Sequence, residues 1–558
     1  MIPEGTIFTM RGRHIAIRVS AILATLIYAG ALWAVDPQPR MGQPLAGMSP
    51  VELARFNTGK TAFEKTFTIE EGLGPIMNQQ SCASCHNNPV GGSGSIAVTR
   101  FGLFDEKGGG FFPMESQGGS LLQNLAINET CAEVIPPGAN VTTLRITTSS
   151  LGIGLLEAIP DADLLANESP GPTISGRAHM VTAFEDPPGS PLRVGRFGWK
   201  AQVATVLTFS ADAALNEMGI TNRFVLAEND PNGVDPPTLG ECDTVADPED
   251  GPDGEGFDFI DRVTDFQRFL ASPPQTPKSG MAGEALFVSV GCAQCHIPSF
   301  VTSNSPSLET AIRNKTIRPY SDFLLHDMGA LGDGIGQGDA EVREMRTPPL
   351  WGIRARDPML HDGRAAAGTF ASRITTAITE HGGFGSEALP SATAYAALLP
   401  AQKQQVIAFL DSLGRAEFDA DGDNDIDAAD LIAMADCYDG SGGYTPDDPC
   451  AIMDIDQDGD VDDNDFTAFL TVYAGPQGDC NGNSVNDARD LFLGTSTDCN
   501  LNALPDECDP ESEDLAIFVA LLLDQITDPV LICMLDKNHD TVVNGADIAP
   551  FVVAYLAP

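Results

Sequence analysis

Apolar and polar residues are distributed in three ways along this 558-residue chain. Residues 19–35 form an almost uninterrupted apolar run, residues 45–415 mix apolar segments with glycine-rich turns, and the remainder alternates short apolar and aspartate-rich segments. Helical periodicity predicts helices over residues 257–270, 401–413, 431–436, 466–473 and 548–555. In the second of these, Val406, Phe409, Leu410 and Leu413 share one face, which predicts packing against a core.

The N-terminal apolar run has the layout of an export signal. Arg11, Arg13 and Arg18 precede it, and small residues at 29–31 and 34 offer cleavage positions. An uncleaved anchor helix is the alternative, although the run is slightly short for a membrane span. We therefore expect an exported protein, in the periplasm, at the cell surface or outside the cell, which meets the membrane only through residues 1–35.

The charge is strongly negative and unevenly placed. The chain has 78 acidic residues against 31 lysines and arginines, a net charge of −47, which excludes nucleic acid as an expected partner. Residues 418–558 alone contain 29 Asp and 3 Glu against Arg489 and Lys537. Aspartate in such excess favours calcium loops over a generic acidic tail.

Two Cys-x-x-Cys-His motifs carry the strongest chemical signal. The first is Cys82-Ala-Ser-Cys85-His86 and the second is Cys292-Ala-Gln-Cys295-His296. This spacing lets two thiols join the vinyl groups of a haem while the adjacent histidine binds its iron. A zinc pair or redox dithiol is the weaker alternative, because both motifs carry the histidine. The sequence predicts two covalently bound c-type haems.

An internal repeat surrounds these motifs. Each is followed, some 55–65 residues on, by a similar phrase, at residues 145–152 and 346–352. We therefore expect a mainly α fold with two cytochrome-c-like haem domains, residues 45–271 and 280–415. Calcium modules follow, at residues 418–475, 479–510 and 514–558.

Several phrases within residues 45–415 carry a family resemblance. They are GLGPIMNQQSC (72–82), GLLEAIP (154–160), GRFGWKA (195–201), YSDFLLHDMG (320–329) and the segments around Arg346 and His361. With both haem motifs, they resemble the di-haem oxidoreductase family, whose domain plan is similar to that of bacterial di-haem cytochrome c peroxidases. The resemblance implies a peroxidase-type oxidoreductase that uses peroxide or another small oxidant and an electron-donor protein.

The resemblance also implies roles for individual residues. His296 and His381 would hold the electron-transferring haem, with Met359 or His361 as alternatives to His381, because this chain has an insertion between His361 and His381. His86 would hold the other haem, whose far side would be open for peroxide. There Glu157 would act as acid and base, and Trp199 would relay electrons between the haems.

Each of these residues also has a purely structural explanation. Glu157 is equally explained as a surface glutamate and Trp199 as a core residue. His326 and His361 are better explained as residues that pack near haem than as ligands. His179 would close the first site if it were a second ligand.

The acidic tail repeats a calcium-loop pattern. Oxygen ligands recur at positions 1, 3, 5, 9 and 12 of three loops, which resemble EF-hand-like loops of dockerin modules. The ligand positions are Asp419, Asp421, Asp423, Asp427 and Asp430; Asp454, Asp456, Asp458, Asp462 and Asp465; and Asp536, Asn538, Asp540, Asn544 and Asp547. Residues 479–490 and 498–509 resemble thrombospondin type-3 repeats instead.

A dockerin-like tail implies a cohesin-like docking partner. The apolar residues of the helices after the first two loops would be available to it: Leu431, Ile432, Met434, Phe466, Phe469 and Leu470. Because the haem ligands lie elsewhere in the sequence, chelation of calcium would leave the haem spectrum unchanged.

The chain has twelve cysteines. Four belong to the haem motifs, and the other eight predict up to four disulfides in an exported protein, with Cys131–Cys242 in the haem half and the other six cysteines in the tail.

Two further functions remain open at this point, an electron carrier with two closed haems and a surface assembly protein.

Overall fold

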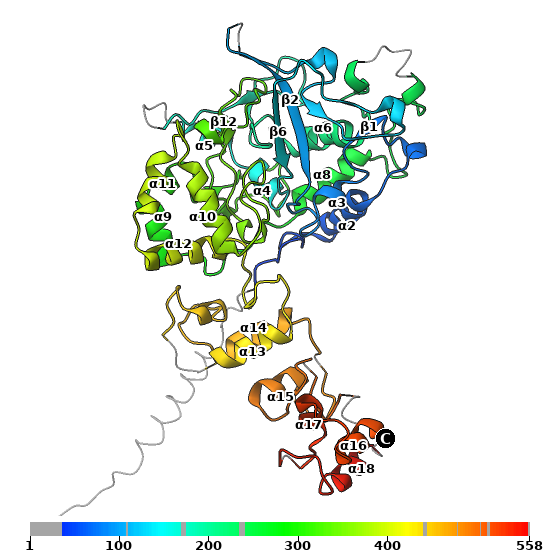
Figure 1. The fold of residues 1–558 in the computed structure, drawn as a ribbon, viewed down its shortest axis with the longest axis vertical. Coiled ribbons are helices and arrows are strands. Elements are labelled where there is room, and N and C mark those ends of the chain that lie inside the picture. Colours follow the sequence, from blue (N-terminus) through cyan, green and yellow to red (C-terminus); the bar gives the residue numbers. More distant parts are fainter. Residues whose placement is uncertain are drawn as a thin grey trace, which may run out of the picture.

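The computed structural model describes residues 36–107, 110–168, 174–233, 240–438, 443–476, 478–502, 504–509, 514–538 and 540–555. The predicted export signal lies outside these residues. Within them, no helix combines the length and the hydrophobicity that a membrane crossing requires. The chain forms a broad haem half, residues 36–415, from which a narrower tail extends (Figure 1).

The haem half is mixed rather than mainly α, because residues 97–146 form an antiparallel sheet. About 34% of the structure is helix and 12% is strand, which corrects the mainly α expectation. β2 (Ala97–Asp105) is central and pairs with β3 (Gly110–Phe112), β4 (Leu121–Leu122) and β6 (Val141–Ile146). Glycine-rich turns flank β2, and its partner β6 lies about 40 residues on, so no local pattern indicates this pairing.

Four further antiparallel pairs are short. They are β1 (Ile76–Met77) with β5 (Leu125–Ala126), β7 (Met180–Val181) with β8 (Arg193–Val194), β9 (Phe300–Val301) with β10 (Thr316–Ile317), and β11 (Leu325–Asp327) with β12 (Glu344–Arg346).

Helices surround the sheet in the first part of the haem half. They are α2 (Pro50–Glu64), α3 (Cys82–Cys85), α4 (Ile153–Glu157), α5 (Asp161–Leu165), α6 (Val206–Met218) and α8 (Phe259–Phe269). Ser49 caps α2 and forms a capping box with Glu52. α2 and α8 pack closely, since a Cβ on Gly59 would lie 2.4 Å from the carbonyl oxygen of Arg262. α8 confirms the helix predicted over residues 257–270.

The second part of the haem half is more helical. It contains α9 (Ala282–Ser289), α10 (Phe370–His381), α11 (Leu389–Ala396) and α12 (Pro400–Ser412). α12 confirms the predicted amphipathic helix, and the four residues of its apolar face are buried. The two predicted haem domains share a hydrophobic core, in which Ile153, Leu156 and Val206 of the first pack with Phe300, Phe323 and Trp351 of the second.

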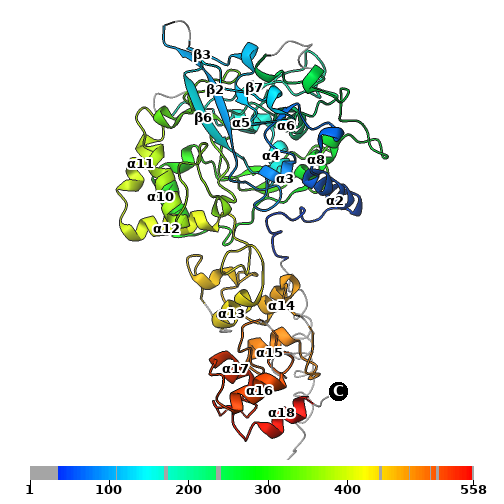
Figure 2. The same ribbon diagram turned by 45° about the vertical axis from the view of Figure 1, so that its right-hand side comes forward.

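The tail consists of short helices between loops (Figures 1 and 2). They are α13 (Ala428–Cys437), α14 (Asp463–Val472), α15 (Asp487–Leu493), α16 (Leu515–Leu522), α17 (Pro529–Leu535) and α18 (Ile548–Tyr555). The tail has two small cores, one around Met434 and Phe466 and one around Phe518 and Phe551.

The tail's first core corrects the surface predicted for a docking partner. Leu431, Met434, Phe466 and Phe469 are buried, because the apolar faces of α13 and α14 join one core with the loop residues Ile426, Ile455 and Val461. Ile432 remains exposed. Most of the apolar residues of these helices therefore stabilise the tail itself.

Four disulfides are formed, and Cys131–Cys242 is one of them, as the sequence predicted. The tail contains the other three, Cys437–Cys450, Cys480–Cys508 and Cys499–Cys533. The four cysteines of the two motifs are unpaired.

Candidate functional site

The first motif forms a single helical turn. Ser81 caps α3 by accepting a hydrogen bond from the backbone N–H of Ser84 (3.1 Å), and Cys82 and Cys85, three residues apart, lie on one side of it. Burial raises the pKa of Cys82 to about 12 and that of Cys85 to about 11.

The two motif histidines have the same local geometry. His86 Nδ1 lies 3.2 Å from the carbonyl oxygen of Gly92, and His296 Nδ1 lies 2.9 Å from that of Tyr320. Burial lowers the pKa of each to about 4, so both rings are neutral. A neutral imidazole whose Nδ1–H is held by a carbonyl presents Nε2 to a metal.

One largely apolar cavity of about 220 Å³ extends between the motifs. At the second motif it is lined by Cys292, Cys295 and His296. At the other end it reaches Asn88 and Ser93, which lie in the loop that follows His86.

Two of the other described histidines are fully engaged by protein groups. His179 Nδ1 donates to the carbonyl oxygen of Lys200 (2.8 Å), and its Nε2 accepts from the N–H of Asp339 (3.2 Å). His326 lies between the carboxylates of Asp322 (2.9 Å) and Glu387 (3.0 Å). Burial alone would lower the pKa of His326, but hydrogen bonds to Asp322, Cys295 and Glu387 raise it to about 12. Neither ring has a nitrogen left for a metal.

His361 and His381 also line the cavity, as His326 does. His381 ends α10, and its Nδ1 lies 2.7 Å from the carbonyl oxygen of Ala377. His361 is 3% exposed, and its Nε2 has no hydrogen-bond partner in the described residues. Burial lowers the pKa of both. Met359 also lines the cavity, so all three residues predicted as alternative ligands lie around the space that the second motif lines.

Trp199 lies between the two motifs. Its Nε1–H donates to the carbonyl oxygen of Ile146 (2.9 Å), and the next residue, Thr147, hydrogen-bonds Cys85. The other side of the indole lines the cavity and contacts His361, with ring centroids 6.2 Å apart. Its position suits a relay, and its burial equally suits a core residue.

Glu157 is held by protein groups and is not among the residues that line the cavity. Its carboxylate accepts hydrogen bonds from Arg268 Nε (2.6 Å) and Nη2 (3.0 Å) and from the N–H of Val206 (2.8 Å), the first residue of α6. These contacts join α4, α6 and α8. The acid/base role stays a prediction, and the contacts favour a positioning role.

Two arginines that were not predicted from the sequence line the same cavity, Arg346, which is buried, and Arg356, which is half-buried. Arg346 donates to the carbonyl oxygens of Gly198 (2.6 Å) and Thr347 (3.0 Å), and Arg356 Nε has no hydrogen-bond partner in the described residues. Burial lowers the pKa of Arg346 to about 9 and that of Arg356 to about 10. Cations without a carboxylate partner fit the anionic propionates of a haem.

The donor set therefore fits haem. At the second motif, two unpaired thiols, neutral histidines and two arginines without a carboxylate partner line one apolar space. The arginines escaped sequence analysis because nothing in a sequence marks an arginine as buried.

The first predicted calcium loop, residues 419–430, brings acidic side chains together. Oxygens of Asp419, Asp421 and Asp430 lie within 4.8 Å of one another. Asp419 is 1% exposed and Asp430 is 0% exposed. Asp419 Oδ1 has no hydrogen-bond partner in the part of the chain that the structure describes, which suits a cation ligand.

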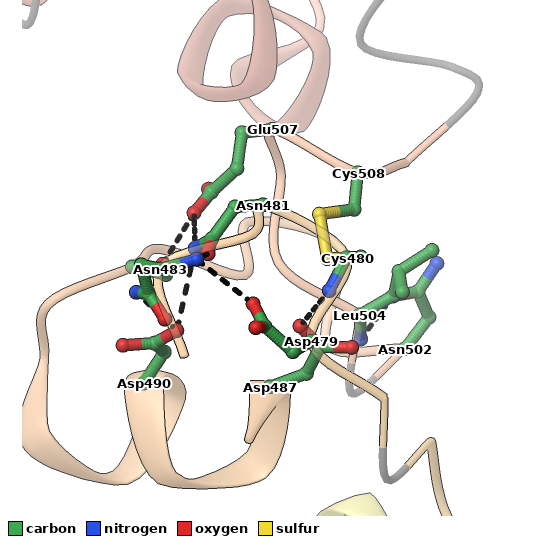
Figure 3. The surroundings of a disulfide bond; sticks show 11 residues. Asp479, Cys480, Asn481, Asn483, Asp487, Asp490, Asn502, Leu504, Glu507 and Cys508 are labelled. Carbon is green, nitrogen blue, oxygen red and sulfur yellow. Dashed lines mark hydrogen bonds between the residues drawn. A yellow bond between two sulfur atoms is a disulfide. The ribbon is translucent and has the colours of Figure 1, made fainter. Parts of the chain in front are cut away.

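The two thrombospondin-like segments fold alike. In the first, the N–H of Cys480 donates to Asp487 (2.9 Å) and the Asn483 amide donates to Asp490 (2.8 Å), as Figure 3 shows. Nineteen residues on, Cys499 and Asn502 make the equivalent bonds, to Asp506 (2.9 Å) and Asp509 (2.7 Å). The repeat seen in the sequence is therefore a structural repeat.

Comparison with known proteins gives one family match. A family model described as "Di-haem oxidoreductase, putative peroxidase" matches residues 127–413. No curated protein matches the chain.

Two solved structures are similar at low identity. One is a MauG-like protein associated with microbial copper homeostasis, at 13% identity and a TM-score of 0.32, covering 69% of this chain and 94% of that one. The other is hydrazine synthase of Kuenenia stuttgartiensis, at 15% identity and a TM-score of 0.29, covering 74% of this chain and 100% of that one.

Proposed function

Because this chain belongs to the di-haem oxidoreductase family, we propose that it is an exported peroxidase-type enzyme with two covalent c-type haems. The observation that carries the proposal is the pairing of each unpaired Cys-x-x-Cys turn with a neutral histidine whose Nδ1 is held by a backbone carbonyl. When bound, the haems supply iron that exchanges electrons with peroxide and with a donor.

The second haem would be closed by protein on both sides. His296 holds one side, and His381 is the preferred ligand on the other, since its Nδ1 is already engaged and its ring lines the cavity. Arg346 and Arg356 would hold propionates, and Trp199 would connect this site to the first motif.

The first haem would be held by His86 and open on its far side. His179 cannot close it without giving up a backbone hydrogen bond, because both of its nitrogens are engaged. An open side is what separates a peroxidase from a carrier. An electron-transfer cytochrome without catalysis is the second candidate, and the free Nε2 of His361 favours it if that ring binds the first haem.

The tail would bind calcium and hold the enzyme in an extracytoplasmic assembly. Converging buried carboxylates and repeated loop geometry support calcium, and four disulfides suit an oxidising compartment. A cohesin-like partner would have to use residues other than the buried apolar ones.

Electron paramagnetic resonance of the oxidised holoprotein tests the enzyme proposal. We expect one low-spin and one high-spin ferric signal, with the high-spin signal lost on addition of a strong-field ligand. Two low-spin signals would replace the enzyme with the electron carrier.

A further inference from the structure

The first calcium loop, residues 419–430, packs against the haem half instead of projecting from it. Arg354 of the haem half donates to the backbone carbonyl oxygens of Asp421 (3.3 Å) and Gly422 (3.4 Å). On the other side, the Asn424 side chain exchanges two hydrogen bonds with the backbone of Met41 (both 3.2 Å). Arg40 donates to the carbonyl oxygen of Asn424 (3.2 Å).

The contact at Arg354 is close and fixed from both sides. Arg354 Nη1 lies 2.6 Å from the carboxylate of Asp411, in the last turn of α12. A Cβ on Gly422 would lie 1.0 Å from Arg354 Nη2, so only glycine permits this approach. The guanidinium is therefore held between α12 and the loop.

The short helix that contains Arg354 also forms part of the haem cavity. Arg354 is the middle residue of η7 (Ile353–Ala355), and Ile353 and Ala355 on either side of it line the cavity, as does Arg356. One 3₁₀ turn thus separates the calcium loop from the space assigned to haem. The sequence-based expectation that the tail is independent of the haems does not take this contact into account.

The loop itself presents a built cation site. Its three converging carboxylates include Asp419, which is 1% exposed and whose Oδ1 has no hydrogen-bond partner in the described part of the chain. Without a cation, the buried carboxylates of Asp419 and Asp430 and the exposed carboxylate of Asp421 repel one another, so the loop backbone that Arg354 recognises is disfavoured.

We propose that calcium bound in loop 419–430 clamps the tail onto η7 and thereby stabilises the wall of the haem cavity. The inference rests on the calcium binding proposed above and adds that one loop regulates the haem half. The coupling is reciprocal: the Arg354 contacts strengthen calcium binding to the same extent that calcium stabilises η7. The haem half would then be more stable where calcium is plentiful, as it is outside a cell, and less stable where calcium is scarce.

Thermal unfolding of the full-length holoprotein, followed by haem absorbance, tests the clamp with calcium or with a chelator. We expect calcium to raise the midpoint by about 2–4 °C, the effect of a modest coupling in a domain of this size. Arg354→Ala should abolish the rise and weaken one calcium site by about fivefold to tenfold in a calcium titration. Arg354→Lys, which keeps the charge, should restore part of both effects.

Two further variants complete the design. Asp536→Asn removes a ligand from the third loop, whose core is separate and which lies at the far end of the tail in both views (Figures 1 and 2), so the calcium-dependent rise should persist. Gly422→Ala leaves the sequence of η7 unchanged but places a Cβ against Arg354 and strains the loop at a φ of 82°, and it serves if Arg354→Ala fails to fold.

The outcomes separate the two proposals. If calcium orders the tail by circular dichroism but leaves the haem midpoint unchanged, the clamp is wrong and the calcium-binding tail stands. If no calcium binds, both are wrong. A rise that persists in Arg354→Ala and in Gly422→Ala also overturns the clamp.

Discussion

Glu157→Gln distinguishes a positioning role from a catalytic one. The Glu157 side chain is 14% exposed and that of Arg268 26%, and two hydrogen bonds join them. Burial alone would lower the pKa of Arg268, but the charge of Glu157 raises it, so the pair is ionic. Glutamine keeps one acceptor oxygen but removes the charge opposite Arg268.

The expected cost follows from these contacts. A charge-assisted hydrogen bond contributes about 1.5–3 kcal/mol, and breaking a fully buried pair costs about 3–5 kcal/mol. Because a quarter of Arg268 is exposed to water, we expect a loss near the lower end, about 2 kcal/mol in the free energy of unfolding. A positioning residue should slow the peroxide reaction less than tenfold, whereas a lost acid/base group costs about 10²–10⁴.

Denaturant unfolding followed by haem absorbance and stopped-flow reaction with hydrogen peroxide measure the two effects. Glu64→Gln, which changes an exposed glutamate of α2, is the matched control and should alter neither. An unchanged unfolding midpoint together with a hundredfold slower peroxide reaction would refute our reasoning and establish Glu157 as the acid/base group.

Three further predictions concern the haems and pH. Intact mass should show two covalent haems, and Cys292→Ser with Cys295→Ser should remove one; a single haem in the wild type contradicts the assignment. His381→Ala should add a high-spin signal to the resonance spectrum, and an unchanged spectrum would transfer the ligand role to Met359 or His361. Burial would raise the pKa of Glu387, but hydrogen bonds to His326 and Ser175 lower it from 4.5 to about 2. The folded state thus binds this proton more weakly than the unfolded state, and the stabilisation is present above pH 4.5 and lost as pH falls to about 2. Glu387→Gln should flatten this part of the stability profile and cost about 2 kcal/mol at pH 6, and an unaltered acid profile would exclude the ion pair as its cause.

Local patterns predicted local structure well. The helix with Val406 and Phe409 on one face, the two haem motifs and the Cys131–Cys242 disulfide all follow from spacing or counting. Features formed by distant segments were not predictable. β2 pairs with β6, and Glu157 contacts Arg268, which is 111 residues further along the chain. Arg354 contacts two tail residues that are 67 and 68 residues away. No periodicity in the sequence predicts any of these contacts.

The apolar residues of the tail show a second limit of prediction from sequence. Phe466 and Met434 have the spacing of a binding face, and the same spacing serves a small internal core. The spacing alone does not decide between the two, because the core forms only when both helices and the loop residues Ile426, Ile455 and Val461 come together in the fold.

The order of the cysteines in the last two disulfides has a consequence for proteolysis. Cys480 pairs with Cys508 and Cys499 pairs with Cys533, so the two bridges overlap along the chain. A protease that cuts once anywhere between residues 480 and 533 leaves both pieces covalently joined, and the same holds for a cut between Cys131 and Cys242. Nicked molecules would therefore migrate as intact chains on a non-reducing gel and separate only after reduction. A protein exported as proposed above would therefore keep its tail after such a cut.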